Sequence, residues 1–190
     1  MTEFTIHDIE SAPEASRPML EKAKQTYGMI PNLLGVLAES PAALEAYMTL
    51  GQIYGSKTSL TTEEQNVVWL AIIYENDCHY CMPAHTAIAK QAGVADDIVE
   101  AMRNGTPLPD AKLQALRTFT AKLVARRGFV DEQDMRALLD AGYTRQTILD
   151  IVVGVSHKTL SNYINHLART PVDPPFTPFE WRKPDNSQVE

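Results

Sequence analysis

The chain has 190 residues, of which 44% are apolar, and its formal net charge is −7. This length fits one domain with a substantial buried core, and the acidic balance repels the phosphate backbone of nucleic acids. The sequence has no cluster of Lys and Arg of the kind that binds DNA or RNA.

Membrane and secreted classes are also disfavoured. The longest uninterrupted apolar run, Val67 to Tyr74, has eight residues, whereas a membrane-spanning helix needs about 20. Met1 to Glu10 carries acidic and polar residues where a secretion signal needs a positive start and an apolar stretch. Two cysteines are too few for a disulfide scaffold in a chain of this length. We therefore expect a protein of the reducing cytoplasm, with no membrane or nucleic-acid partner.

The N-terminal part carries clear helix boundaries. A first helix is predicted from Pro13 to Tyr27, because Gly28 follows it as a left-handed cap. A short apolar segment, Leu33 to Ala38, comes after a turn. The next helix begins with Ser40 as its N-cap and Pro41 at its first position, where the missing N–H of proline costs nothing.

The apolar run from Val67 to Tyr74 fits either a buried strand or a helix that is buried on most sides. Thr61 and Glu64 form a capping box of the kind that begins a helix. No hairpin turn or partner strand with alternating polarity lies nearby in the sequence. These features favour a core helix.

Further helices are predicted in the second half of the chain. They run from His85 to Ala92, Ala95 to Asn104, Asp110 to Arg127, Asp131 to Ala141 and Thr144 to Ala168. Helices joined by short turns, with no clear strand, indicate that residues 1–170 form a single all-α domain, a helical bundle.

Residues 171–190 differ in kind from the rest of the chain. Their prolines forbid regular helix, while their aromatic residues are too apolar for a free linker. We expect an extended Pro-rich C-terminal arm that packs on the body or on a neighbouring subunit. A partly ordered tail of no consequence is the alternative.

The most informative pattern is Cys78, Cys81 and His85. At ~100° per residue, the three side chains fall within about 60° on one face of a helix. A histidine one turn from a thiol can accept its proton, and the thiolate is the form that attacks peroxides. Attack by Cys81 gives a sulfenic acid, which Cys78 converts to a disulfide. An external dithiol then has to reduce that disulfide.

The helix that carries this pattern has two possible starts. Asp77 is a natural N-cap and places Cys78 in the first turn. Pro83 argues against this register, because a proline beyond the first turn removes a backbone hydrogen bond. A start at His79 or Tyr80 relieves the conflict. In either register the helix begins within the motif.

Two non-catalytic interpretations of the cysteine pair remain open. The thiols can be small buried hydrophobes without reactivity. Together with His85 they are also three of the four ligands of a tetrahedral zinc site, with the fourth from His79, His157 or His166. A thioredoxin-like motif is excluded, because that motif belongs to a strand–helix–strand unit.

The predicted last helix carries a polar stripe that includes His157 and His166. Its other members are Ser156, Lys158, Asn162 and Asn165. A polar stripe is usually the solvent face of a helix, so we expect this one to be solvated or to contact another subunit rather than to be catalytic.

Residues 78–85, preceded by the long apolar helix, resemble the carboxymuconolactone decarboxylase superfamily, in its alkyl hydroperoxidase D-like, peroxidase-related branch. Supporting matches are the segment Ile30 to Leu33 and the following Ser40 and Pro41. The resemblance covers roughly Tyr27 to Ala168, which is most of the chain. It implies an all-α fold that assembles into homo-oligomers, often trimers or hexamers.

The resemblance also implies an activity, the reduction of hydroperoxides by a thiol peroxidase that depends on a dithiol and uses no metal or other cofactor. By position, Cys81 is the peroxidatic cysteine, Cys78 resolves it, and His85 belongs to the proton relay. Decarboxylase members of the superfamily typically lack the cysteine pair, which argues against that chemistry. A decarboxylase-like enzyme and a metal-binding or structural homologue with a non-redox pair are the alternatives.

The sequence departs from the family pattern at two positions. Asn66 stands where the relay of the family usually has a glutamate, and an amide cannot transfer a proton as a carboxylate does. Glu63, Glu64 or Glu75 could replace that glutamate, and the spacing does not select among them. Tyr80 stands where some relatives have histidine.

Overall fold

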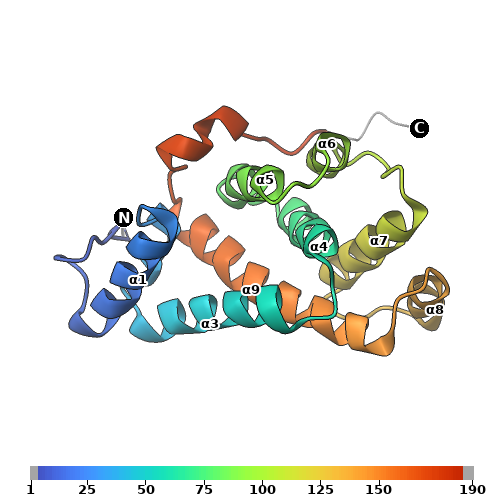
Figure 1. Cartoon of the computed structure of the whole chain (residues 1–190), viewed down its shortest axis with the longest axis horizontal. Coiled ribbons are helices and arrows are strands. Elements are labelled where there is room, and N and C mark those ends of the chain that lie inside the picture. Colours follow the sequence, from blue (N-terminus) through green and yellow to red (C-terminus); the bar gives the residue numbers. More distant parts are fainter. Residues whose placement is uncertain (1–3, 186–190) are drawn as a thin grey trace.

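The computed structural model describes residues 4–185, and this part of the chain is built of helices without a β-strand (Figure 1). The α-helices are α1 (Arg17–Tyr27), α2 (Asn32–Leu37), α3 (Pro41–Lys57), α4 (Thr62–Glu75), α5 (Cys81–Gln91), α6 (Asp96–Asn104), α7 (Ala111–Ala125), α8 (Glu132–Asp140) and α9 (Arg145–Ala168). Two short 3-10 helices are η1 (Glu14–Ser16) and η2 (Pro174–Phe179). The all-α prediction is confirmed. None of the described helices is long and apolar enough to span a membrane.

Local capping signals set the helix ends where the sequence predicts them. Gly28 closes α1 with a φ of 73°, in the left-handed region. The side chain of Ser40 accepts a hydrogen bond from the N–H of Ala43 at the start of α3. Thr61 and Glu64 form the complete capping box that begins α4.

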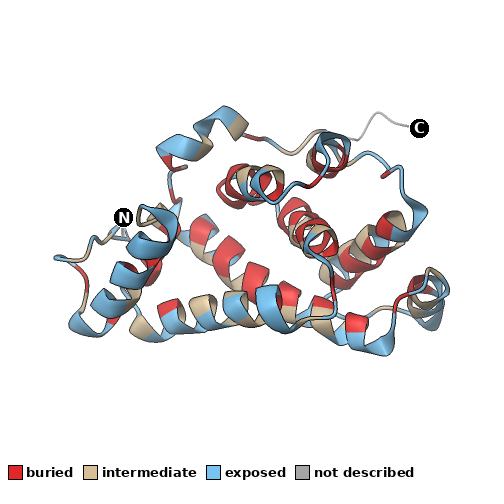
Figure 2. Ribbon diagram, viewed as in Figure 1, coloured by how far each residue is buried: buried red, intermediate tan, exposed pale blue. Residues whose placement is uncertain are grey.

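Helix α4 is the core of the fold. It packs against α5, α6, α7 and α9, so that every side of it meets another helix. Ile72 and Ile73, which point to different sides of α4, are both 0% exposed. Burying such a side chain contributes about 1.5–3 kcal/mol. Because the apolar run is surrounded on all sides, it shows no polar face in the sequence (Figure 2).

Helix α9 approaches α3 closely at Gly154. A Cβ atom at this position would lie 2.7 Å from the ring of Tyr54, which is nearer than packed side chains allow. Tyr54 is 0% exposed, and its hydroxyl donates to the carbonyl of Gln65 in α4. The glycine therefore lets α9 lie against α3 and α4. Lys158 follows one helical turn later, on the same face of α9.

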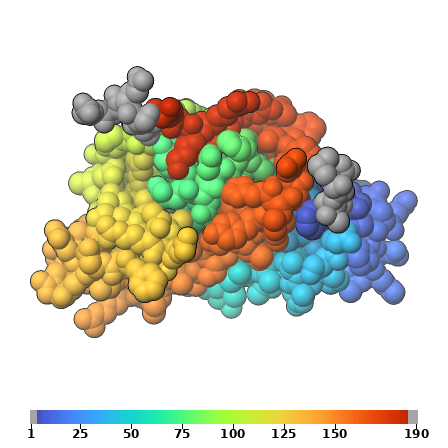
Figure 3. Space-filling view, turned by 180° about the vertical axis from the view of Figure 1, so that it is seen from behind, coloured from blue at the N-terminus to red at the C-terminus, as the bar shows by residue number. Residues whose placement is uncertain are grey.

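Residues 171–185 form an arm that runs across α5 to α6 on the same chain (Figures 1 and 3). The arm is extended except for the 3-10 turns of η2. Trp181 anchors it, because its ring is only 8% exposed and its Nε1–H donates to the carbonyl of Arg103 at 2.8 Å. The remainder of the expected arm, residues 186–190, lies outside the described residues.

Candidate thiol site

The end of α4 places Cys78. The backbone of Asp77 has a φ of 51°, and the N–H groups of Asp77 and Cys78 donate to the carbonyls of Tyr74 and Ile73. This is the Schellman arrangement that ends a helix. Asp77 therefore closes α4, and the prediction that it is the N-cap of the next helix is wrong. Aspartate is one of the few residues besides glycine that adopt this left-handed conformation readily.

Helix α5 begins at Cys81, with Tyr80 as its N-cap residue. This start is later than the registers predicted from the sequence, and it removes Cys78 from the helix. Pro83 is the third residue of α5, where no backbone N–H is needed for a helical hydrogen bond. The proline thus fixes the start of the helix, and Cys78 lies in the turn before it.

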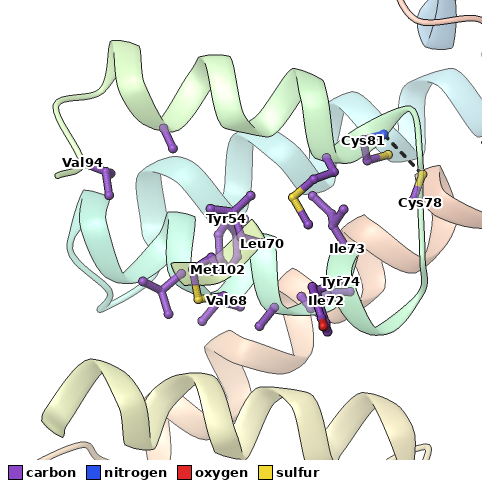
Figure 4. Packing of buried hydrophobic residues seen from close by; sticks show 14 of the residues in the cluster. Tyr54, Val68, Leu70, Ile72, Ile73, Tyr74, Cys78, Cys81, Val94 and Met102 are labelled. Carbon is purple, nitrogen blue, oxygen red and sulfur yellow. Dashed lines mark hydrogen bonds between the residues drawn. The ribbon is translucent and has the colours of Figure 1, made fainter. Parts of the chain in front are cut away.

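The two cysteines lie next to each other despite this change of register (Figure 4). The backbone N–H of Cys81 donates to the Sγ of Cys78 at 3.4 Å. Both are free thiols, and their exposed fractions are 0% for Cys78 and 2% for Cys81. The structure therefore presents a reduced, buried thiol pair at the junction of α4 and α5.

The polar stripe of α9 faces this pair, and the prediction that the stripe is solvated is wrong for most of its members. The buried members are His157, Lys158, Asn162 and Asn165. Ser156 and His166 are exposed, as expected. A helix whose polar residues point inward needs buried partners for them. Residues of the α4–α5 segment supply hydrogen bonds to Lys158, Asn162 and Asn165.

Two amides connect α9 to the thiol segment. The Nδ2 of Asn165 donates to the Sγ of Cys81 at 3.2 Å. The Nδ2 of Asn76, at the end of α4, donates to the Oδ1 of Asn162 at 2.9 Å. These bonds hold the last helix against the turn that carries Cys78.

His85 lies one turn along α5 from Cys81, as predicted, but its ring is bonded elsewhere. Its Nε2 lies 2.7 Å from the Nζ of Lys158. In the described part of the chain no hydrogen bond joins the ring to either sulfur, and its Nδ1 is buried without a partner. A protonated lysine can only donate, so Nε2 accepts and the proton of a neutral His85 lies on Nδ1. His85 is therefore paired with Lys158 rather than with a thiol.

The surroundings separate the pKa values of the two thiols. Burial acts to raise the pKa of Cys81. The hydrogen bond with Cys78 and the charge of Lys158 act against burial, followed by the side-chain amides of α9, and together they lower the pKa of Cys81 to about 6. The hydrogen bond to Cys81, together with burial, raises the pKa of Cys78. Near neutral pH, Cys81 is thus the thiolate and Cys78 the thiol.

Burial also controls the basic groups of the site. It lowers the pKa of Lys158 to about 8, although the neighbouring Cys81 and Cys78 act to raise it. Burial, followed by the charge of Lys158 and the influence of His157, lowers the pKa of His85 well below its usual value. Burial and the charge of Lys158 lower the pKa of His157 as well. Lys158 is therefore the cation of the site, and both histidines are neutral.

The acids that could replace the family glutamate lie on another side of α4. Glu64 completes the capping box and pairs with Lys112 of α7 at 3.1 Å. Glu63 lies beside it in the first turn of α4. Glu75 lines a surface hollow together with Arg117. None of the described contacts of these acids reaches a cysteine.

The ligands of the zinc alternative do not gather around the thiols. Within residues 4–185, no group of three His, Cys, Asp or Glu side chains could hold a metal ion. His79 points to the arm, where its Nδ1 lies 3.2 Å from the carbonyl of Trp181. His166 is exposed, and its ring stacks on Tyr163. His157 packs against the ring of Tyr47 at a centroid distance of 4.5 Å.

Tyr80 joins the cysteine motif to the arm. Its hydroxyl donates to the Oδ2 of Asp173 at 2.5 Å and accepts from the N–H of Leu33 at 3.2 Å. The other oxygen of Asp173 accepts from the N–H of Asn32. Since His79 also contacts the arm, both residues between the cysteines are bonded to it.

Lys158, Asn162 and Asn165 line the site but were not predicted from the sequence as functional candidates. Their spacing of four and then three residues places them on one face of α9, which is the available signal. The opposite face carries large apolar residues that are exposed, namely Leu149, Val152, Tyr163 and Leu167. A helix with a polar inner face and an apolar outer face reverses the usual pattern, and this reversal marks a buried polar site.

The segment that carries the thiol site also matches a known protein family. Residues 41–122 match the carboxymuconolactone decarboxylase family. The match begins with α3, ends within α7 and includes both cysteines and His85. No curated protein matches the chain.

Several solved structures share nearly the whole fold. A peroxidase-related protein of Ralstonia eutropha JMP134, described as an alkylhydroperoxidase AhpD core, has a TM-score of 0.80 and 21% identity, over 92% of this chain and 93% of that one. A peroxidase-related protein of Silicibacter sp. TM1040 has a TM-score of 0.77 and 21% identity, over 92% and 95%. A cysteine-to-alanine variant of the debrominase Bmp8, in complex with 2,3,4-tribromopyrrole, has a TM-score of 0.77 and 16% identity, over 93% and 94%. These likenesses establish the fold.

Proposed function

Because residues 41–122 match the carboxymuconolactone decarboxylase family and the chain shares its fold with an alkylhydroperoxidase AhpD core, we propose that it is a thiol-dependent peroxidase of that superfamily. It reduces hydroperoxides with electrons from an external dithiol. The observation that carries this proposal is the buried pair itself, in which the backbone N–H of Cys81 contacts the Sγ of Cys78 at 3.4 Å. Two cysteines that contact each other can oxidise to a disulfide with little backbone movement.

The environment assigns different roles to the two sulfurs. Cys81, with its lowered pKa, is the nucleophile that attacks the peroxide, and it becomes a sulfenic acid. Cys78, which burial and the bond to Cys81 keep protonated, attacks that sulfenic acid and forms the disulfide. An exogenous dithiol returns the pair to the reduced state. His85 takes part in the proton relay through Lys158.

The proposed setting follows from the same chemistry. Two free thiols without structural disulfides suit the reducing cytoplasm, where a dithiol reductant is present.

We also propose that the chain self-associates, with α9 as the contact. Its exposed apolar residues lie on one side of the helix, opposite Lys158, and α9 extends across the face seen in Figure 3. An apolar face on a long helix can pair with its own copy.

Intact-mass measurement with alkylation tests the proposed activity. The reduced protein should take up two alkyl groups. After one equivalent of a hydroperoxide it should take up none, and its own mass should fall by two hydrogens. Cys81→Ser should lose dithiol-dependent peroxide consumption while keeping its helix content. Unchanged consumption in that variant, or alkylation that peroxide does not block, contradicts the proposal. Bromide release from 2,3,4-tribromopyrrole without peroxide consumption would assign the thiols to debromination instead.

A further inference from the structure

Lys158 is a buried cation without a carboxylate partner. Its side chain is 0% exposed, and none of the ion pairs in residues 4–185 includes it. An unpaired ammonium inside a protein is strongly destabilising, so a chain keeps one only where other groups offset this cost. Lysine is therefore a poor choice for packing alone, since methionine would fill the same space.

Three helices around Lys158 contribute groups that offset the cost of burying its charge. The rings of Tyr47 from α3 and Trp69 from α4 lie 5.5 Å from its Nζ, on the scale of cation–π contacts. From α5, His85 accepts a hydrogen bond through Nε2. His157, its neighbour on α9, is neutral and adds no negative charge.

The cysteines are the remaining titratable groups that act on Lys158. Tyr47 stays protonated because burial raises its pKa, and Cys78 stays protonated as well. Cys81 is therefore the only group around Lys158 in the described chain that becomes an anion near neutral pH. The buried ammonium and the buried thiolate offset each other's desolvation.

We propose that Lys158 is a catalytic residue of the thiol site, whose buried ammonium holds Cys81 as a thiolate and gives one proton to the alkoxide for each peroxide reduced. This inference deepens the proposed function and rests on it for its catalytic consequence. Lys158 also orients His85, because its bond to Nε2 fixes the proton of the imidazole on Nδ1.

The reduction of one hydroperoxide at this site conserves atoms and charge. The thiolate of Cys81 attacks the terminal oxygen of the hydroperoxide, an S–O bond forms, the O–O bond breaks, and the alkoxide takes the proton that Lys158 gives up. The thiol of Cys78 then attacks the sulfenic sulfur, an S–S bond forms, and the hydroxyl leaves as water with the proton of Cys78. The two sulfurs have lost two electrons. Lys158 is neutral, as expected for a buried amine that has lost its anion.

Reduction completes the cycle. A dithiol returns two electrons and two protons to the pair, and the proton on Cys81 passes to Lys158 to restore the thiolate and the ammonium. This arrangement also accounts for Asn66. Its Nδ2 donates to the carbonyl of Thr62 within α4, and it cannot carry a proton as a glutamate does. In this site the proton-carrying group is Lys158 of α9 instead.

The test is a pH titration of the ultraviolet absorbance of the thiolate in the reduced full-length protein, for the wild type and for Lys158→Met. In the wild type one thiolate should form below neutral pH. In Lys158→Met its midpoint should rise by about one pH unit or more, which is a loss of roughly tenfold in thiolate below the midpoint. Lys90→Met is the matched control, since Lys90 lies on α5 and pairs with Asp96 at the surface. An equal midpoint in Lys158→Met and the wild type overturns the proposal.

A double-mutant cycle of thermal stability covers the case in which Lys158→Met packs differently. Cys81→Ser should destabilise the wild type more than it destabilises Lys158→Met, because only the wild type then loses the anion of a buried cation. Additive effects contradict the proposed coupling between the charges of Lys158 and Cys81. Both measurements are independent of turnover. A wild type that forms the low-pH thiolate but does not consume peroxide contradicts the proposed function and the proton transfer to the alkoxide, and leaves only the stabilisation of the thiolate by Lys158 intact.

Discussion

The side-chain amide of Asn165 donates a hydrogen bond to the Sγ of Cys81 across 3.2 Å, and so ties the last long helix to the first residue of α5. The donor favours the thiolate over the thiol, because a hydrogen bond to a charged acceptor is stronger than one to a neutral acceptor. Asn165 thus acts directly on the proposed nucleophile, without a charge of its own.

Replacing Asn165 with alanine should raise the pKa of Cys81. We expect the rate of its reaction with a hydroperoxide to fall by about fivefold at pH 6 and by little at pH 8, where the thiolate forms in either case. Stopped-flow measurement of the second-order rate constant at both pH values checks this. Asn104→Ala, at the exposed end of α6, is the control. An equal loss at both pH values would indicate a structural role instead.

The wild-type reaction should show a bell-shaped dependence on pH. The rate should rise as pH increases through about 6, where Cys81 loses its proton. It should fall again above about 8, where Lys158 loses the proton that the alkoxide needs. Rate constants measured from pH 5 to 9 check both limbs. In Lys158→Met, the falling limb should be absent and the rising limb should move to higher pH.

The helices of this fold could be predicted from the sequence because their ends are local. Ser40 and the capping box of Thr61 and Glu64 bind backbone groups three residues away, so neighbouring residues suffice to place them. The start of α5 was harder to predict from the sequence. It depends on Pro83 and on Asp77, which ends α4 in a left-handed conformation that aspartate takes in only some settings.

The site was predictable only in part, for a related reason. The cysteines are neighbours in the sequence, so their spacing revealed them. Lys158 meets His85 across a separation of 73 residues. A single sequence shows that Lys158 shares a polar face with Asn162 and Asn165, but not whether that face meets solvent or thiols. That distinction needs the packing of α9, which Gly154 makes possible by its contact with Tyr54.

Mild acid should destabilise the protein through its buried histidines. Burial holds the pKa of His85 and His157 well below 6.5, so the unfolded chain binds more protons than the folded one below that pH. Stability is therefore lost as pH falls through the unfolded value, by roughly 1 kcal/mol per histidine at pH 5.5. Urea unfolding at pH 7 and pH 5.5 measures this loss. It should be smaller in His157→Gln and unchanged in His166→Gln, whose histidine is exposed on α9.

Loss of the Tyr80 hydroxyl should loosen the arm. Tyr80→Phe removes the donor to Asp173, a carboxylate that is only 1% exposed, and the acceptor of the Leu33 N–H. Leaving buried polar groups unpaired costs about 1–3 kcal/mol. We expect a lower melting temperature and faster proteolytic cleavage between residues 171 and 185. Tyr163→Phe, whose side chain is exposed, is the control. Equal cleavage of the two variants would show that the hydroxyl does not hold the arm.

The exposed apolar side of α9 should determine the size of the assembly. Leu149 and Leu167 lie near its two ends and are 67% and 72% exposed. If this side pairs with a second copy, the double variant Leu149→Lys and Leu167→Lys places like charges in an apolar interface. The measured mass should therefore fall to that of the monomer. Light scattering gives the mass, and circular dichroism checks that the helices remain. Phe129→Lys, 84% exposed and outside α9, should leave the mass unchanged. A wild type that is already monomeric, or a double variant of unchanged mass, contradicts self-association through α9.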